Sequence, residues 1–237
     1  MTTKATLTAL LLSAATLAVA AAPALAASAG PADPALRADV SAILTNLGAD
    51  PATLTPSALA RVKKHLERIL GRPTLGATWE RKKEAWPGIA RALQAEALPE
   101  EIGFLAWAES GFRSDAQSPA GSRGVWQFIP ATARKFGLAV DDKNDDRLDT
   151  FKETRAAARY LKTLKDEFHG APLLALAAYN QGEFQVRRIV AAAPAEHAKD
   201  FFWLAEQGAF NEEGAEYVPR FLAAAAIGMH PAKYGLK

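Results

Sequence analysis

A single glutamate, Glu109, interrupts an otherwise apolar helix face. In the segment LPEEIGFLAWAESG, residues Ile102, Leu105 and Ala106 recur at the i, i+3, i+4 spacing of a buried helical stripe, and Glu109 occupies the next position. Burial disfavours an ionised carboxylate, and so does the negative end of a helix, so both raise the pKa of such an acid towards neutrality. General acid catalysis requires a carboxyl group that is protonated near neutral pH. The spacing therefore predicts that Glu109 is a catalytic acid.

A structural interpretation of Glu109 competes with the catalytic one. Glu109 and Arg113 stand at i, i+4, which is the common spacing of a surface ion pair. However, Gly111 is expected to end the helix before such a pair forms, and an ion pair leaves the apolar stripe unexplained. Pro99 is expected to occupy the first position of this helix. Because buried acids are often structural, the helix alone leaves both interpretations open, and the rest of the chain favours the catalytic one.

Two further clusters each combine an aromatic ring with a side-chain amide. The first, residues 124–128, holds Trp126 and Gln127, and the second, residues 178–182, holds Tyr179 and Asn180. Such rings stack on sugars, and amides hydrogen-bond to acetamido groups. Taken singly, each cluster also fits core packing or a helix cap.

Several kinds of chemistry lack support in the sequence. No nucleophile-elbow, phosphate-binding or dinucleotide motif is present, and the four histidines are widely separated, which argues against a zinc site. Residues 142–153 partly follow a calcium-loop template, but Arg147 replaces the required glycine, so an acidic turn is the better interpretation. The formal charge of +2 is too small to indicate nucleic-acid binding. No metal and no cofactor are expected.

Taken together and in this order, the clusters resemble the catalytic domain of the soluble-lytic-transglycosylase family, the lysozyme-like enzymes that cut bacterial peptidoglycan. The motifs that carry the resemblance are Glu109-Ser110, Ser118-Pro119-x-Gly121-x-x-Gly124-Val125-Trp126-Gln127, Ala178-Tyr179-Asn180-x-Gly182 and Tyr217-Val218-Pro219-Arg220. They extend over residues 98–227. The Trp-Gln-Phe form and the segments 145–149 and 201–204 look closest to the membrane-bound D-type branch.

The resemblance implies roles for individual residues. Glu109 would be the sole catalytic acid/base. The residues that would bind the glycan strand are Ser118, Gln127, Tyr179, Asn180, Glu213 and Tyr217, with Asn180 shaping its loop. Gly214 stands where the family usually has threonine after the glutamate, which makes the role of Glu213 less secure.

The implied reaction needs only one carboxylate. Protonated Glu109 would donate to the oxygen between N-acetylmuramic acid and N-acetylglucosamine, and would then accept the proton of the muramyl 6-hydroxyl as the 1,6-anhydro ring closes. A water-using hydrolase resembling goose-type lysozyme is one alternative, and it needs a second carboxylate, about 5–9.5 Å away. Asp115 and Glu183 are the nearest in sequence, and both are expected to be solvated. A non-catalytic peptidoglycan-binding or assembly scaffold is the other alternative.

The first residues follow the pattern of a secretory signal peptide. Lys4, an apolar run and Ala24-Leu25-Ala26 predict removal of residues 1–26. No cysteine follows, so neither disulfides nor a lipid anchor are expected, nor is an integral membrane segment after signal removal. The mature chain is expected to be exported and periplasmic.

The elements that must position these residues are predicted to be helical throughout. An all-α, lysozyme-like catalytic domain is expected over residues 91–237, after an N-terminal helical extension at 27–90 that could contact a cell-envelope protein. Helices are expected at 34–47, 56–70, 89–97, 99–110, 130–136, 152–168, 172–179, 184–192, 201–207 and 217–227. A connection is expected at 72–88, with a short helical piece around residues 79–86.

Overall fold

Residues 33–237 are described by a computed structural model, and their regular secondary structure is helical. They form ten α-helices, four 3₁₀ turns and three isolated β-bridges, with no β-strand among them. The helices are α1 (Pro34–Leu47), α2 (Pro56–Leu70), α3 (Leu75–Ala95), α4 (Leu105–Ser110), α5 (Pro130–Lys135), α6 (Thr150–Glu167), α7 (Pro172–Gln181), α8 (Glu183–Ala192), α9 (Phe201–Glu206) and α10 (Glu212–Met229). The all-α prediction is confirmed. The predicted signal peptide, residues 1–26, lies outside the described residues.

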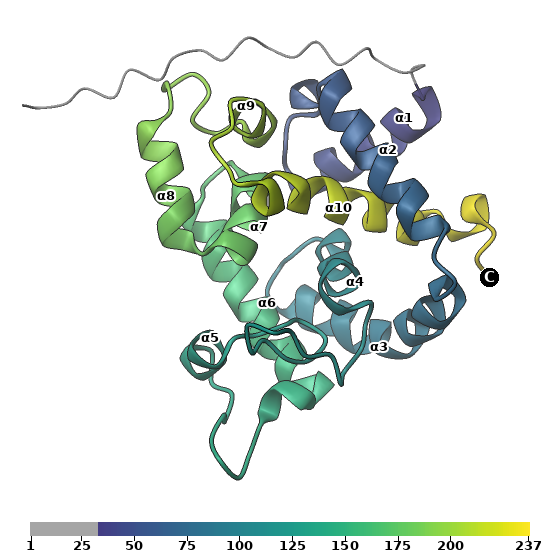
Figure 1. Ribbon diagram of the computed structural model, residues 1–237, viewed down its shortest axis with the longest axis vertical. Helices are drawn as coiled ribbons and strands as arrows, with labels where there is room; N and C mark the ends of the chain where they lie inside the picture. Colours follow the sequence, from purple (N-terminus) through teal and green to yellow (C-terminus); the bar gives the residue numbers. More distant parts are fainter. Residues whose placement is uncertain (1–32) are drawn as a thin grey trace, which may run out of the picture.

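Helix α10 passes through the centre of the molecule, with α1 and α2 on one side and α3 and α4 on the other (Figure 1). Its Tyr217, Phe221 and Ile227 are fully buried. Small residues let neighbouring segments approach closely: a Cβ atom added to Gly228 would lie 1.8 Å from the ring of Phe104. Helix α10 is therefore the element against which the rest of the core packs.

The N-terminal helices share this core. Leu44 of α1 and Val62 of α2 are fully buried. His65 Nε2 lies 2.6 Å from Glu216 Oε2 on α10, which joins α2 to the central helix. The division into an N-terminal extension and a catalytic domain stays a prediction, and its limit at residues 90 and 91 lies inside α3.

Helix α3 corrects the predicted connection at residues 72–88. One continuous helix runs from Leu75 to Ala95 and contains Pro87. We expected instead a connection with a short helical piece around residues 79–86, followed by a separate helix from residue 89. A proline inside a helix costs about 3 kcal/mol. Burial of Trp79, Ile89 and Leu93 on one side of α3 outweighs this cost, because each removes a large apolar side chain from water.

The segment that carries Glu109 begins differently from the prediction. Pro99 precedes a 3₁₀ turn, Glu100–Phe104, and the α-helix begins only at Leu105. Short 3₁₀ turns often start an α-helix, and here the tight turn places Gly103 where an added Cβ would lie 2.8 Å from Ile89 Cγ2. The expected buried face is confirmed, and Gly111 ends α4 with a φ of 62°.

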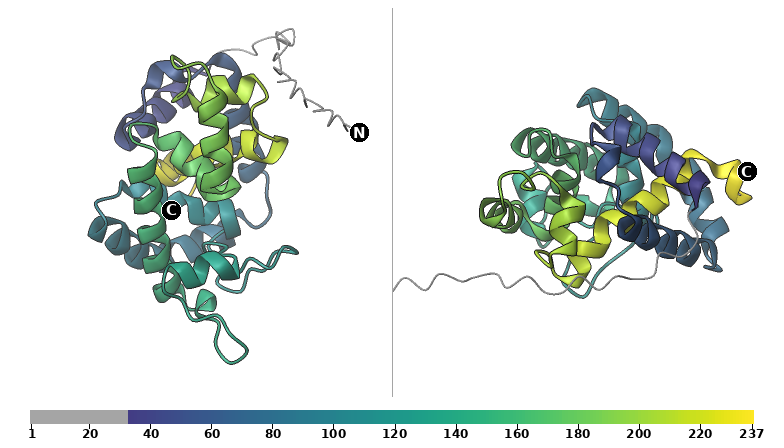
Figure 2. Two further views of the ribbon diagram at one scale, coloured as in Figure 1. Left: turned by 90° about the vertical axis from the view of Figure 1, so that its left-hand side faces the viewer. Right: turned by 90° about the horizontal axis from the view of Figure 1, so that it is seen from above.

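The loop between α5 and α6 projects from one end of the molecule, as seen in Figure 1 and in the left view of Figure 2. At its tip the Asp141 carboxylate accepts hydrogen bonds from the backbone N–H groups of Lys143 and Asn144. Glu153, the last position of the calcium-loop template, instead lies in the core with none of its surface exposed. None of the helices between residues 33 and 237 combines the length and apolar character needed to cross a membrane.

Candidate active site

Glu109 lies in the last turn of α4 and faces α10. The Tyr217 hydroxyl donates a hydrogen bond to Glu109 Oε1 at 2.5 Å. The pKa of Glu109 is raised to about 7, mainly by burial and to a smaller extent by the nearby charge of Glu213. The Tyr217 hydrogen bond and the charge of Arg220 oppose this effect because they favour the ionised form. Glu109 keeps a minor part of its surface accessible, so its carboxyl group can contact a ligand. With a pKa of about 7, this group is about half protonated at pH 7.

The competing ion-pair interpretation of Glu109 is wrong. Arg113 lies beyond the end of α4, and its Nε donates to Asp115 Oδ1 at 3.1 Å. The left-handed Gly111 turns the chain before Arg113 can return to the helix face of Glu109. The partner of Glu109 is the neutral hydroxyl of Tyr217.

Ser110 fastens the end of α4 to the loop that follows. Its hydroxyl donates to the carbonyl oxygen of Val125 at 2.7 Å and accepts from the backbone N–H of Arg113 at 3.1 Å. Residues 121–128 are thereby held against the turn that contains Glu109. This bond explains why a serine follows Glu109: its hydroxyl holds the next loop against the end of α4.

Ser118 and Gln127 are linked through Ser122. Ser122 Oγ lies 2.7 Å from Ser118 Oγ and donates to Gln127 Oε1 at 2.8 Å. The other end of the amide, Gln127 Nε2, donates to the carbonyl oxygen of Gly124 at 2.8 Å. Gln127 adopts a φ of 54°, and these bonds at both ends of its amide hold that left-handed conformation. Two of the predicted binding residues thus belong to one hydrogen-bonded loop.

Tyr179 reaches the same loop from α7. Its hydroxyl donates to the carbonyl oxygen of Trp126 at 2.8 Å. Burial, followed by the charge of Glu109, raises the pKa of Tyr179 well above its usual value, so the phenol stays protonated. Asn180, the next residue, accepts from Gln181 Nε2 at 2.6 Å near the end of α7. Tyr179 therefore lies within electrostatic range of Glu109, whereas Asn180 bonds locally.

Glu213 is the most peripheral of the predicted binding residues. It is exposed, and Arg220 donates to its Oε1 at 2.8 Å. It influences Glu109 through charge rather than through a hydrogen bond. The neighbouring Gly214 is buried, and an added Cβ would lie 2.9 Å from Gln181 Cδ. The side chain of Gln181 thus fills the space that a larger residue at 214 would need.

Glu153 is a residue of this region that the sequence analysis missed. It lies on α6, and its two carboxylate oxygens accept from the backbone N–H groups of Val125 at 2.7 Å and Trp126 at 3.0 Å. Burial raises the pKa of Glu153 to about 8, opposed by these two N–H groups and by the charge of Arg147. Its carboxyl group therefore positions the loop that carries Gln127.

The signal that could have identified Glu153 is present in the sequence. Ala156, Ala157, Tyr160 and Leu164 form the buried face of α6, and Glu153 precedes them at the same spacing. This is the pattern that singled out Glu109. The calcium-loop template drew attention to the acids of the preceding turn instead. Among residues 33–237, no three or more metal-binding side chains converge.

Comparison with known proteins assigns part of the chain to a known domain family. Residues 88–202 match the transglycosylase SLT domain. The chain is 34% identical over 149 residues to membrane-bound lytic murein transglycosylase D of Escherichia coli (strain K12), which covers 63% of this chain and 32% of that protein. It is 46% identical over 80 residues to a peptidoglycan transglycosylase of Escherichia phage T7, which covers 33% of this chain and 6% of that protein.

A solved structure supports the same assignment. An inactive mutant of the lytic transglycosylase Slt from Pseudomonas aeruginosa superposes with a TM-score of 0.51 and 27% identity, over 62% of this chain and 24% of that one. The helical fold is therefore of the lysozyme-like class. Within that class, residues 88–202 form a transglycosylase SLT domain. The chain spans about a third of the length of the Escherichia coli relative.

Proposed function

We propose that this protein is a peptidoglycan lytic transglycosylase that cleaves the bond between N-acetylmuramic acid and N-acetylglucosamine and leaves a 1,6-anhydromuramyl end. The observation that carries the proposal is the state of Glu109 within the SLT domain: a buried carboxyl group with a pKa of about 7, bonded to Tyr217. Such a group can donate a proton and then accept one at neutral pH.

The carboxylates that a hydrolase would have to recruit from the neighbouring motifs, Asp115 and Glu183, are both engaged in ion pairs. Asp115 is exposed and pairs with Arg113, while Glu183 pairs with Lys135 at 3.2 Å. The Arg113 hydrogen bond lowers the pKa of Asp115, and a backbone hydrogen bond, followed by Lys135, lowers the pKa of Glu183, so each is ionised and engaged. A hydrolase would need a second carboxylate to activate water or to attack the sugar. The muramyl 6-hydroxyl replaces that nucleophile in the proposed reaction.

The groups around Glu109 have roles in this mechanism. Glu109 protonates the leaving oxygen and then, as a carboxylate, accepts the proton of the 6-hydroxyl. Tyr217 stabilises the carboxylate between these two steps, because its hydroxyl donates to the ionised oxygen. The loop that contains Ser118 and Gln127 would hold the acetamido group of the muramyl residue. The glycan strand is the substrate, and the signal pattern of residues 1–26 supports export to the periplasm.

The test is mass spectrometry of the products released from isolated peptidoglycan by the chain without residues 1–26. We expect muropeptides one water lighter than hydrolytic products. Glu109→Gln should reduce their release by at least about a hundredfold, which is the scale of general acid catalysis. Glu100→Gln, an exposed glutamate in the same segment, is the matched control and should retain activity.

Two results would contradict the proposal. Products with ordinary reducing ends would identify a hydrolase and would require a second carboxylate. Absence of products from a folded chain that still binds peptidoglycan would identify a binding scaffold instead.

A further inference from the structure

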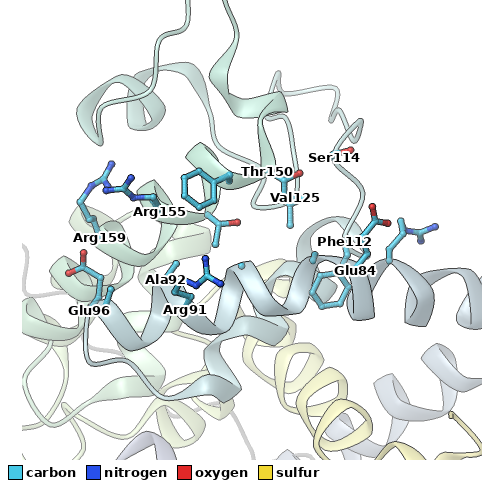
Figure 3. A pocket seen from close by; sticks show the side chains of 16 residues that line it. Glu84, Arg91, Ala92, Glu96, Phe112, Ser114, Val125, Thr150, Arg155 and Arg159 are labelled. Atoms are coloured by element: carbon cyan, nitrogen blue, oxygen red, sulfur yellow. The ribbon is translucent and has the colours of Figure 1, made fainter.

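A cleft of about 740 Å³ lies between α3, the first half of α6 and residues 112–125 (Figure 3). None of the predicted site residues lines it. It shares a wall with the active-site region, however, since Val125 accepts a hydrogen bond from Ser110 on its carbonyl oxygen and also lines the cleft. The cleft is therefore a separate site that lies behind the loop next to Glu109.

Arginine side chains dominate the charge of this cleft. The four that line it are Arg81, Arg91, Arg155 and Arg159. Arg81 donates to the carbonyl oxygen of Gly111, and Arg159 to that of Phe136, but a carbonyl leaves the positive charge unneutralised. Within residues 33–237, no carboxylate forms an ion pair with any of the four. Guanidinium groups placed in this way are the preferred partners of carboxylates.

Two glutamates, Glu84 and Glu96, also line the cleft. Four guanidinium groups against two carboxylates leave a net positive lining. Glu84 and Glu96 would repel a uniformly anionic polymer such as a polyphosphate, but they suit a ligand that also carries an amino group. The lining therefore complements a zwitterionic ligand of net negative charge.

Between the charged groups, the lining combines small apolar residues with the hydroxyl groups of Ser114, Thr150 and Thr154. Gly88 and Ala92 of α3 line the cleft together with Phe112 and Val125, and Figure 3 shows Val125 on the side opposite Ala92. The small residues of α3 leave room for methyl-sized side chains along an extended ligand. The ring of Phe151, 58% exposed, lies beside Arg155 at the edge.

We propose that this cleft binds a short peptide of net negative charge that also carries an amino group, and that the peptide stems of peptidoglycan are its source. The second part rests on the function proposed above. Carboxylates of the stem would pair with Arg91 and Arg155, which project from the two opposite helices. The small aliphatic side chains would lie against α3. A strand with intact stems would then contact the protein at two separate sites.

Calorimetric titration with a sugar-free stem tetrapeptide (L-alanine, D-glutamate, meso-diaminopimelate, D-alanine) tests binding directly. We expect the double variant Arg91→Gln/Arg155→Gln to weaken affinity by about tenfold or more, because two charge-assisted bonds are lost. The matched control Arg72→Gln/Arg188→Gln removes the same charge from exposed positions on α8 and beside α2, outside the cleft, and should bind like the unchanged protein. Equal affinity of the cleft variant, or no binding by the unchanged protein, would overturn the proposal.

Vesicles containing phosphatidylglycerol distinguish a lipid headgroup from a peptide. The peptide proposal predicts that the cleft variant and the control variant bind them equally. Loss of vesicle binding in the cleft variant alone, without peptide binding, would assign the cleft to anionic lipid and overturn the proposal.

Activity on two substrates separates this proposal from the proposed function. The cleft variant should show a raised KM on strands with intact stems and unchanged kinetics on strands from which an amidase has removed the stems. Arginine-dependent peptide binding by a chain that cleaves neither substrate would leave the peptide site in place and refute the enzymatic function. Cleavage of both substrates by the cleft variant with unchanged KM would refute the peptide site and leave the enzymatic function in place.

Discussion

The behaviour of Glu109 depends on a balance between burial and the groups around it. Burial raises its pKa, while the Tyr217 hydroxyl and the Arg220 charge lower it, and the outcome is a value of about 7. Because the proposed first step requires the protonated acid, activity should fall as pH rises through this pKa. The pH at which activity falls, the alkaline limb of the pH profile, therefore reports on the residues that surround Glu109.

Substitutions on either side of Glu109 should move the alkaline limb in opposite directions. Tyr217→Phe removes the hydrogen bond that favours the carboxylate, so the pKa of Glu109 rises and the limb moves to higher pH. Glu213→Gln removes a nearby negative charge, so the pKa falls and the limb moves to lower pH. The measurement is kcat/KM on isolated peptidoglycan between pH 5 and about pH 9, a range chosen to bracket the limb.

Glu212→Gln is the matched control for the charge effect. Glu212 is the exposed neighbour of Glu213 and does not contribute to the pKa shift of Glu109. Its pH profile should coincide with that of the unchanged protein. A shift of the same sign for Tyr217→Phe and Glu213→Gln would show that this account of the electrostatics is wrong.

The element that decides the shape of the site is the loop of residues 121–128. Ser110 of α4, Glu153 of α6 and Tyr179 of α7 each bond to its backbone. Gly124, with a φ of +85°, lets the loop approach both α6 and the turn before it. An added Cβ would lie 2.0 Å from the carbonyl oxygen of Arg147 in that turn and 2.5 Å from Glu153 Oε1 on α6. Three helices thus define one loop conformation.

Gly124→Ala should destabilise the protein more than Gly121→Ala. Both glycines have φ above +80°, but a Cβ at Gly121 would meet no atom within 4 Å. The control therefore costs only the left-handed backbone conformation, about 1–2 kcal/mol. In Gly124→Ala the new methyl group would also push away the Arg147 carbonyl and the Glu153 carboxyl group. We therefore expect a further loss of about 1–3 kcal/mol in the free energy of unfolding. Urea denaturation measures both, and equal losses would refute the close approach.

At the scale of the whole molecule, the N-terminal helices and the SLT domain share one core around α10. Leu44→Ala, a substitution in α1, should lower the free energy of unfolding by about 2–5 kcal/mol and leave a single transition. Leu148→Ala changes the same side chain where it is 47% exposed, and it should cost about 0.5 kcal/mol or less. Thermal unfolding followed by circular dichroism is the measurement. A separate early transition in Leu44→Ala would instead indicate an independent N-terminal unit.

The stability of the molecule should also depend on pH through its buried acids. Burial raises the pKa of Glu153 from 4.5 to about 8, so the folded chain retains a proton that the unfolded chain has released. Its contribution to stability is therefore present below pH 4.5 and is lost as pH rises to about 8. Glu109 acts in the same direction up to about pH 7. His65, whose pKa is lowered by burial, acts in the opposite direction around its ordinary value.

A comparison of variants isolates the contribution of Glu153. Glu153→Gln cannot titrate, so its free energy of unfolding should decline less between pH 5 and about pH 8 than that of the unchanged protein. Chemical denaturation at several pH values provides the measurement, with Glu100→Gln as the exposed control. Parallel pH curves for Glu153→Gln and the unchanged protein would contradict the raised pKa.

Local patterns in the sequence determined most of the helices and the most important residue. The helical period predicted α1 and α2 to the residue and α6, α7 and α8 closely, because each buries one continuous stripe against the core. The same period singled out Glu109 as an acid on a buried face. Proline and glycine signals also placed Gly111 correctly at the end of α4.

Tertiary contacts decided what these patterns could not. The continuity of α3 through Pro87 depends on burial of its apolar side chains, which no local signal reveals. The partner of Glu109 is Tyr217, 108 residues away in the chain, and the loop of residues 121–128 is held by Glu153 from another helix. The pKa of Glu109 is set by these distant groups and by burial. Sequence spacing determines which residues share a helix face, whereas only the folded chain decides which face meets which partner.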